Sequence, residues 1–279
     1  MWFRKFSEFI LFSSLFIAFC AVGFSIETNI LLGLPLNPPG FYCFVFGATL
    51  VQYNLHYVSK KEAVKDSIRF AWSQKNQSIH YLLLFAGIIL VLISFLSFNL
   101  RHFYILIFLG AIALLYSFPL IPFGKKRRLK EFGILKIFTL SLLWTLVTVW
   151  FPVENMADHR AFFWLVFAER FVFMFVLCLL FDIRDHKIDT LKGIRTIPVY
   201  ISIKRSYTLS YLLLILFYVI CVFHYYLLPQ NGFITAMTVS VIATYLIIKI
   251  SQKNASDIVY LSGVDGMMLL QAILVILLV

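Results

Sequence analysis

The chain has 279 residues, of which 62% are hydrophobic and 13% are charged, and its formal net charge is +11. Soluble globular proteins are roughly half apolar and about one quarter charged, so this composition excludes a soluble domain. The four cysteines lie in apolar stretches without the spacing of metal ligands, and we expect neither a disulfide nor a metal site from them.

Apolar stretches of about 20 residues, long enough to cross a membrane, recur along the whole chain. We predict nine membrane-spanning helices, at 9–26, 39–58, 79–97, 103–121, 133–152, 161–181, 206–227, 231–250 and 258–279. The predicted fold is therefore all-α: a polytopic membrane protein in which residues 1–279 form a single bundle of nine transmembrane helices.

The basic residues are distributed unevenly between the two predicted sides of the membrane. Of the 24 lysines and arginines, 21 fall at the N-terminus or in the loops that follow every second span. Because cytoplasmic loops carry an excess of Lys and Arg, we expect the N-terminus and the loop at 182–205 to be cytoplasmic. The expected location is the bacterial inner membrane. Topology accounts for the positive charge, so no nucleic-acid partner is expected.

Several polar residues lie inside the predicted spans, where a charge at mid-helix costs about 2.5–3.5 kcal/mol. We interpret Glu169 and Arg170 as members of ion pairs with neighbouring helices, and the alternative is that one of them lines a cavity. Asp265 is interpreted as a helix-packing residue. Four histidines lack the spacing of metal ligands and are assigned no chemistry: His80, His102, His159 and His224.

A strongly basic segment follows Tyr116-Ser-Phe-Pro119 after the fourth span. It contains Lys125, Lys126, Arg127 and Arg128. Attraction to anionic lipid headgroups explains most of this charge. One or two of these side chains reaching inward to a phosphate is the alternative.

Three carboxylates follow the sixth span: Asp182, Asp185 and Asp189. On a helix they share a stripe of roughly 80°, where like charges repel unless a cation lies between them. Mg²⁺ suits this position, because it binds one or two carboxylates together with phosphate oxygens. Nearby basic side chains are suited to a diphosphate: Arg184, Lys187, Lys192 and Arg195. An ordinary solvated loop of mixed charge is an equally open interpretation.

These features together resemble the UbiA-type intramembrane prenyltransferases over nearly the whole chain. The resemblance is carried by the nine spans, by Tyr116-Ser-x-Pro119 before a basic loop, and by Asp182-x-x-Asp185-x-x-x-Asp189-x-x-x-Gly193-x-x-Thr196-Ile-Pro198. It implies that Asp182, Asp185 and Asp189 are catalytic residues that hold Mg²⁺ and the diphosphate of a polyprenyl diphosphate. The basic residues near them, and one or two of those at 125–128, would bind the phosphates.

The family has a second Asp-rich motif after the second span, Asn-x-x-x-Asp-x-x-x-Asp. This chain reads Asn54-x-x-x-Val58-x-x-x-Glu62 there. The resemblance therefore implies that Asn54 binds substrate and that Glu62 is a metal ligand. With the central Asp replaced by Val58, we expect weaker Mg²⁺ binding than in a complete motif.

The leading functional hypothesis is a prenyltransferase that moves a prenyl group to a lipophilic acceptor, such as an aromatic quinone precursor or a lipid, within the membrane. The alternative, motivated by Val58, is a non-catalytic membrane protein that binds an isoprenoid lipid or a partner protein. A terpene cyclase differs from the first hypothesis only in its product. A transporter is a third class, but the two halves of the chain show no paired repeat.

Overall fold

The computed structural model describes residues 2–59, 68–117, 131–153 and 160–279, and throughout these ranges the regular structure is helical, with no strand. The helices are α1 (Trp2–Phe12), α2 (Leu15–Leu31), α3 (Pro39–Ser59), α4 (Ile68–Lys75), α5 (Gln77–Ser94), η1 (Phe95–Ser97), α6 (Leu100–Ser117), α7 (Ile134–Thr145), η3 (Leu146–Trp150), α8 (Arg160–Leu191), α9 (Ile197–Ile201), α10 (Ile203–Leu227), α11 (Phe233–Lys253), η4 (Val259–Val264) and α12 (Gly266–Leu278).

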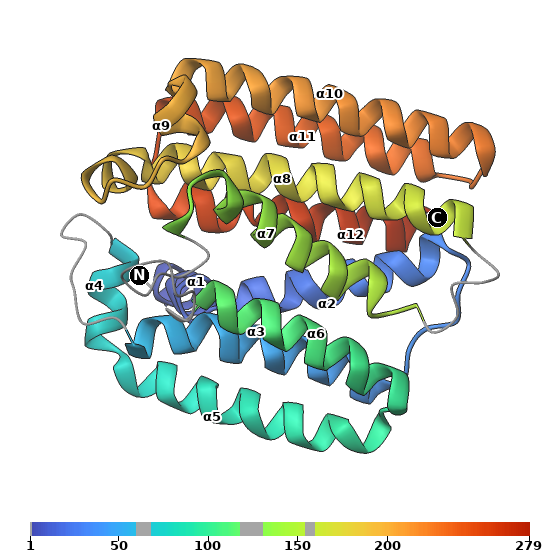
Figure 1. Ribbon diagram of the computed structural model, residues 1–279, viewed down its shortest axis with the longest axis horizontal. Coiled ribbons are helices and arrows are strands. Elements are labelled where there is room, and N and C mark those ends of the chain that lie inside the picture. The colour runs from blue at the N-terminus through green and yellow to red at the C-terminus, as the bar shows by residue number, and fades with distance from the viewer. Residues whose placement is uncertain (1, 60–67, 118–130, 154–159) are drawn as a thin grey trace.

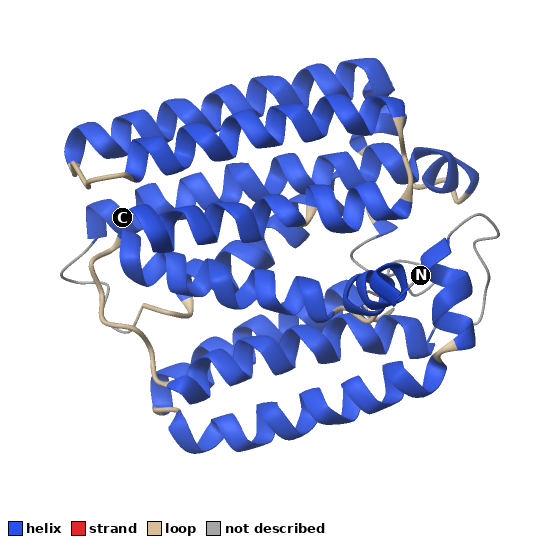
Figure 2. Cartoon of the chain, turned by 180° about the vertical axis from the view of Figure 1, so that it is seen from behind, coloured by secondary structure: helices blue, strands red, loops and turns tan. Residues whose placement is uncertain are grey.

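The long helices lie side by side along the long axis of the molecule (Figure 1). Helix α8 is central and contacts α7 and α10, while α12 contacts α2 and α11. Helices α10 and α11 form one edge of the bundle, and α5, which packs on α3, forms the opposite edge. The view from behind shows the same rows of helices with no strand between them (Figure 2). The predicted all-α bundle is thus confirmed.

Among the described residues, five helices are long and apolar enough to cross a membrane, and a sixth is added if the bent pair α1–α2 counts as one span. Helix α6 and the α7–η3 segment are apolar but shorter. Each of the nine predicted spans overlaps a helix. The count of nine crossings stays a prediction, whereas the integral membrane character follows from the five long apolar helices.

The first predicted span, 9–26, differs from the structure in two ways. It is broken near Ser14, which has a left-handed backbone at φ 72°, and α1 meets α2 at 61°. Helix α2 also extends past the predicted end and carries Glu27 into the interior, where it is fully buried. The prediction ended the span at this carboxylate because it did not anticipate a partner, and Arg170 of α8 supplies one.

The sixth predicted span, 161–181, also continues further than expected. Helix α8 ends only at Leu191, so the Asp-rich stretch is helical and the connecting segment is shorter than the predicted loop. Gly193 ends the helix with φ +68°, a backbone conformation that glycine adopts without strain. The Ile194 amide then donates to the Asp189 carbonyl at 2.9 Å, which closes the last turn.

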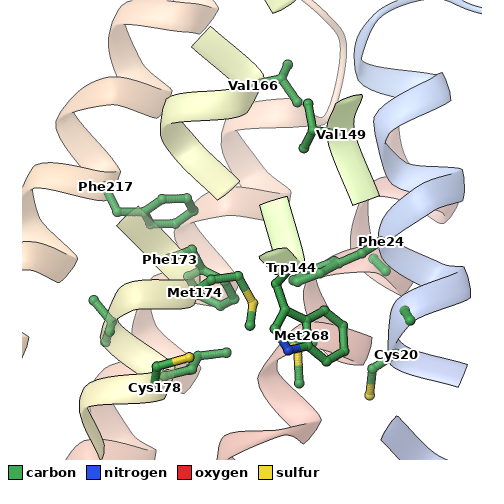
Figure 3. Close-up of a cluster of buried hydrophobic side chains, with 14 of the residues drawn as sticks. Cys20, Phe24, Trp144, Val149, Val166, Phe173, Met174, Cys178, Phe217 and Met268 are labelled. Carbon is green, nitrogen blue, oxygen red and sulfur yellow. The ribbon is translucent and has the colours of Figure 1, made fainter. Parts of the chain in front are cut away.

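An apolar interior lies along α8 on the N-terminal side of the Asp-rich stretch. Side chains from several helices meet there, among them Phe24 of α2, Trp144 of α7, Phe173 of α8 and Met268 of α12 (Figure 3). Cys178, four residues before Asp182, belongs to the same buried cluster. Asp182, the first of the carboxylates, is therefore one helical turn from this buried apolar cluster.

Candidate functional site

Two of the three predicted carboxylates are joined by a lysine from another helix. The Lys136 Nζ of α7 lies 2.8 Å from Asp182 Oδ1 and 3.1 Å from Asp189 Oδ2. The two aspartates are seven residues apart on α8, so they lie on nearly the same face. Asp182 is 3% exposed and Asp189 is 5% exposed. The single Lys136 ammonium is thus the counter-charge of two buried carboxylates.

The third carboxylate, Asp185, belongs to a neighbouring ionic cluster. Arg184 Nε donates to Asp185 Oδ1 at 2.9 Å, and Arg184 Nη1 lies 3.7 Å from Asp257 Oδ1, just before η4. The Arg69 amide of α4 donates to the other Asp257 oxygen at 3.0 Å. The Arg184 guanidinium also lies over the rings of Phe181 and Tyr260. This cluster ties α4, α8 and the α11–η4 connection together.

The surviving residue of the first motif, Asn54, is fully buried between α3 and α5. Its amide nitrogen donates to the Leu50 carbonyl at 2.9 Å, and its oxygen lies 2.6 Å from His80 Nδ1. The Tyr57 ring stacks on the His80 ring with 5.1 Å between the ring centroids. The Arg69 guanidinium lies over the same Tyr57 ring, 4.6 Å from its centroid. Asn54 is therefore engaged in the packing of its own helix pair, and its role in substrate binding stays a prediction.

The remaining predicted site residues fall into two groups. Lys187, Lys192 and Arg195 are exposed, and the structure gives them no ion pair within the described ranges. The others lie outside the described residues: Glu62, Lys125, Lys126, Arg127 and Arg128. Tyr116, before the basic segment, lies in the last turn of α6.

The donor chemistry of the Asp182–Asp189 pair fits Mg²⁺. Both side chains offer hard oxygen atoms, a cationic group already lies between them, and Asp182 Oδ2 is buried without a hydrogen-bond partner. Among the described residues no three His, Cys, Asp or Glu side chains converge on one point. Two carboxylates are nevertheless a common protein contribution to a Mg²⁺ site that phosphate oxygens complete.

The sequence prediction missed Lys136, Arg69 and His80. Lys136 lies near the start of the fifth predicted span, 133–152, where it follows Ile134 and Leu135. A lysine within an apolar helix needs a partner in the protein interior, and that signal was available from the sequence. The partners of Arg69 and His80 lie on other helices, and residue spacing does not reveal them.

A second buried polar cluster lies nearer the N-terminal end of α8. Arg170 Nη2 lies 3.1 Å from Glu27 Oε1 of α2, and Gln271 of α12 donates to the same oxygen at 2.9 Å. The neighbouring Glu169 pairs with His224 Nδ1 of α10 at 2.9 Å. The predicted ion pair with a neighbouring helix is confirmed for Arg170, and Glu169 faces the His224 ring of α10.

Comparison with known proteins agrees with this architecture. A sequence profile of the UbiA prenyltransferase family matches residues 73–259, more than half of the chain. No curated protein sequence matches the chain. A UbiA homolog from Archaeoglobus fulgidus bound to DMAPP and Mg²⁺ superposes with a TM-score of 0.61 at 12% identity, over 97% of this chain and 98% of that chain.

Two further solved structures have the same fold. The Archaeoglobus fulgidus homolog bound to GPP and Mg²⁺ gives a TM-score of 0.59 at 12% identity, over 97% of this chain and 98% of that chain. A digeranylgeranylglyceryl phosphate synthase gives 0.55 at 14% identity, over 98% of each chain. At these identities the structures establish a shared fold.

Proposed function

Because the chain belongs to the UbiA prenyltransferase family, we propose that it transfers a prenyl group from a polyprenyl diphosphate to a lipophilic acceptor within the membrane. The observation that carries this proposal is the buried Asp182–Asp189 pair with its single ammonium, one turn of α8 from an apolar interior. Structural relatives bound to GPP or DMAPP together with Mg²⁺ support the same class of donor. We place the site at the cytoplasmic face, as the charge distribution predicts.

In this proposal Asp182, Asp185 and Asp189 hold Mg²⁺ and, through it, the diphosphate. Bound Mg²⁺ would neutralise charge on the departing diphosphate, which makes it a better leaving group. Arg184 lies beside Asp185, and its planar guanidinium is suited to phosphate oxygens. Arg69, whose backbone amide donates to Asp257 and whose guanidinium lies over the Tyr57 ring, adds a second guanidinium to this end of the bundle.

The apolar interior would receive the prenyl chain. This buried cluster includes Phe24, Trp144 and Phe173, and aromatic faces stabilise a nearby positive charge. The reaction breaks the allylic carbon–oxygen bond, the electron pair leaves with the diphosphate, and the acceptor forms the new bond and releases a proton. Exclusion of water from this interior would keep the allylic cation from being hydrolysed.

The proposal is tested by the binding of labelled geranyl diphosphate to the detergent-purified protein, with and without Mg²⁺. We expect binding that depends on Mg²⁺ in the wild type and a loss of at least about tenfold in affinity for Asp182→Asn and Asp185→Asn, the factor for one lost charge-assisted contact. The matched control is Glu169→Gln, which removes a buried carboxylate thirteen residues earlier on α8 and should bind as the wild type does.

Val58 favours a second candidate function. It stands where the family has the central Asp of the first motif, on the described part of α3. A descendant that binds isoprenoid lipids without turnover would retain the apolar interior and lose Mg²⁺-dependent diphosphate binding. Geranyl diphosphate that binds equally well with and without metal, and is never consumed in the presence of candidate acceptors, would favour this second function.

A further inference from the structure

We propose that the Lys136 ammonium is a tethered counter-cation of the Asp182–Asp189 pair, which a divalent metal ion must displace in order to bind there. The proposal rests on the proposed function for its place in the reaction, and it adds a residue that competes with the metal. The cation of the resting site is thus supplied by the protein itself.

The two carboxylates already share one cationic group. Lys136 Nζ lies 2.8 Å from an oxygen of Asp182 and 3.1 Å from an oxygen of Asp189. Mg²⁺ binds carboxylate oxygens at about 2.0–2.1 Å, so an ion held by Asp182 and Asp189 would compete with the ammonium for the same two side chains. Two cations at such separation repel strongly in a buried site. Metal and ammonium therefore exclude each other.

The lysine is held at this position by the start of its helix. Gly133, immediately before α7, has φ +44°, and a Cβ atom there would collide with the Arg195 carbonyl oxygen. This close approach fixes the first turn of α7 against the segment that follows α8. Lys136 is in that first turn, so its side chain crosses directly to the α8 carboxylates.

This arrangement couples metal binding to substrate binding. In the resting protein the metal must compete with a positive charge that never diffuses away, which lowers its affinity for the pair. When a diphosphate is present, its oxygens offer the displaced ammonium new acceptors, because an ammonium donates equally well to phosphate oxygens. We therefore expect metal and diphosphate to bind more tightly together than separately.

The test measures metal binding in the absence of substrate. Mn²⁺ serves as the probe because it shares the carboxylate preference of Mg²⁺, and free Mn²⁺ is quantified by electron paramagnetic resonance. Lys136→Met should bind Mn²⁺ at least about tenfold more tightly than the wild type, since one competing charge-assisted contact is removed. Lys136→Arg, which keeps the charge, should not show this gain. Lys204→Met, at an exposed position on α10, is the control and should match the wild type.

The double variant Lys136→Met with Asp182→Asn locates the effect. It should lose the gain in Mn²⁺ affinity if the gain arises at the carboxylate pair. Equal or weaker Mn²⁺ binding by Lys136→Met than by the wild type would overturn the proposal. Failure of every variant to bind geranyl diphosphate, with the gain in Mn²⁺ affinity intact, would contradict the proposed function and leave the counter-cation assignment supported.

A second measurement on the wild type covers the case in which Lys136→Met does not fold. Acylation of Lys136 by a water-soluble amine reagent is followed by mass spectrometry as Mn²⁺ is added. Displacement frees the ammonium from its two carboxylates, so the acylation rate of Lys136 should rise with metal while that of Lys204 stays constant. An acylation rate at Lys136 that does not change with saturating Mn²⁺ overturns the proposal.

Discussion

At the scale of single residues, the buried Arg170 shows how costly charge is accommodated in the interior. Its guanidinium lies 3.1 Å from Glu27 and over the Phe24 ring at 3.5 Å, and both charged side chains are essentially inaccessible. Substituting Arg170→Met leaves Glu27 buried without its counter-charge, so we expect a loss of about 3–5 kcal/mol in the free energy of unfolding. Denaturant unfolding in detergent micelles measures this loss.

The double variant Arg170→Met with Glu27→Gln separates the effect of the buried charges from that of packing. It removes both charges, leaves Gln271 an amide partner, and should recover most of the lost stability. Arg205→Met, on the exposed surface of α10, should change stability by no more than about 0.5 kcal/mol. No recovery in the double variant would show that Arg170 stabilises the bundle by packing on Phe24 and not by its charge.

Sequence reasoning at this scale succeeded where a local pattern carried the information. The spacing of Asp182, Asp185 and Asp189 predicts one helix face. In the structure Asp182 and Asp189 both contact Lys136, whereas Asp185 pairs with Arg184. Sequence reasoning failed for Lys136 because nothing in the apolar run around that residue says which helix supplies its partner. Its partners are 46 and 53 residues away along the chain, a separation that one sequence gives no means to bridge.

At the scale of helices, the α3–α5 pair depends on two glycines in direct contact. A Cβ atom on Gly87 would lie 2.8 Å from the Gly47 carbonyl oxygen and 3.0 Å from a Val51 methyl group. Gly87→Ala must therefore push the two helices apart, and we expect a loss of about 1–3 kcal/mol in the free energy of unfolding. Thermal unfolding of the purified protein measures the change.

Gly110 of α6 provides the matched control for Gly87. A Cβ atom there meets nothing within 4 Å, so Gly110→Ala should be neutral or stabilise by up to about 1 kcal/mol through helix propensity. Equal stability of the two variants would mean that the α3–α5 contact is loose enough to absorb a methyl group.

The positions of the helices were predicted well from apolar run length, and their ends were not. The apolar runs predict that the spans end before Glu27 and before Asp182, and a charge within a helix interior is costly. In the structure each is compensated from a different helix, Glu27 by Arg170 and the aspartates by Lys136, so α2 and α8 continue. Helix ends thus depended on tertiary partners.

At the scale of the whole molecule, composition and the family resemblance gave the architecture directly. A bundle of apolar helices with the UbiA fold was predicted, and the family match and the solved relatives confirm it. The side of the membrane on which each loop lies is a different kind of statement. It rests on the distribution of Lys and Arg, which acts during insertion and leaves no separate trace in the folded bundle.

The orientation can be measured with single cysteines at the two ends of one helix. Asn231 lies just before α11 and Lys253 ends it, and both are exposed. In a variant without Cys20, Cys43 and the other native cysteines, Asn231→Cys should react with a membrane-impermeant maleimide in intact cells. Lys253→Cys should react only after the membrane is permeabilised, because the basic loops are expected in the cytoplasm. The opposite labelling pattern would place the Asp182–Asp189 pair on the outer face, where cytoplasmic prenyl diphosphate cannot reach it.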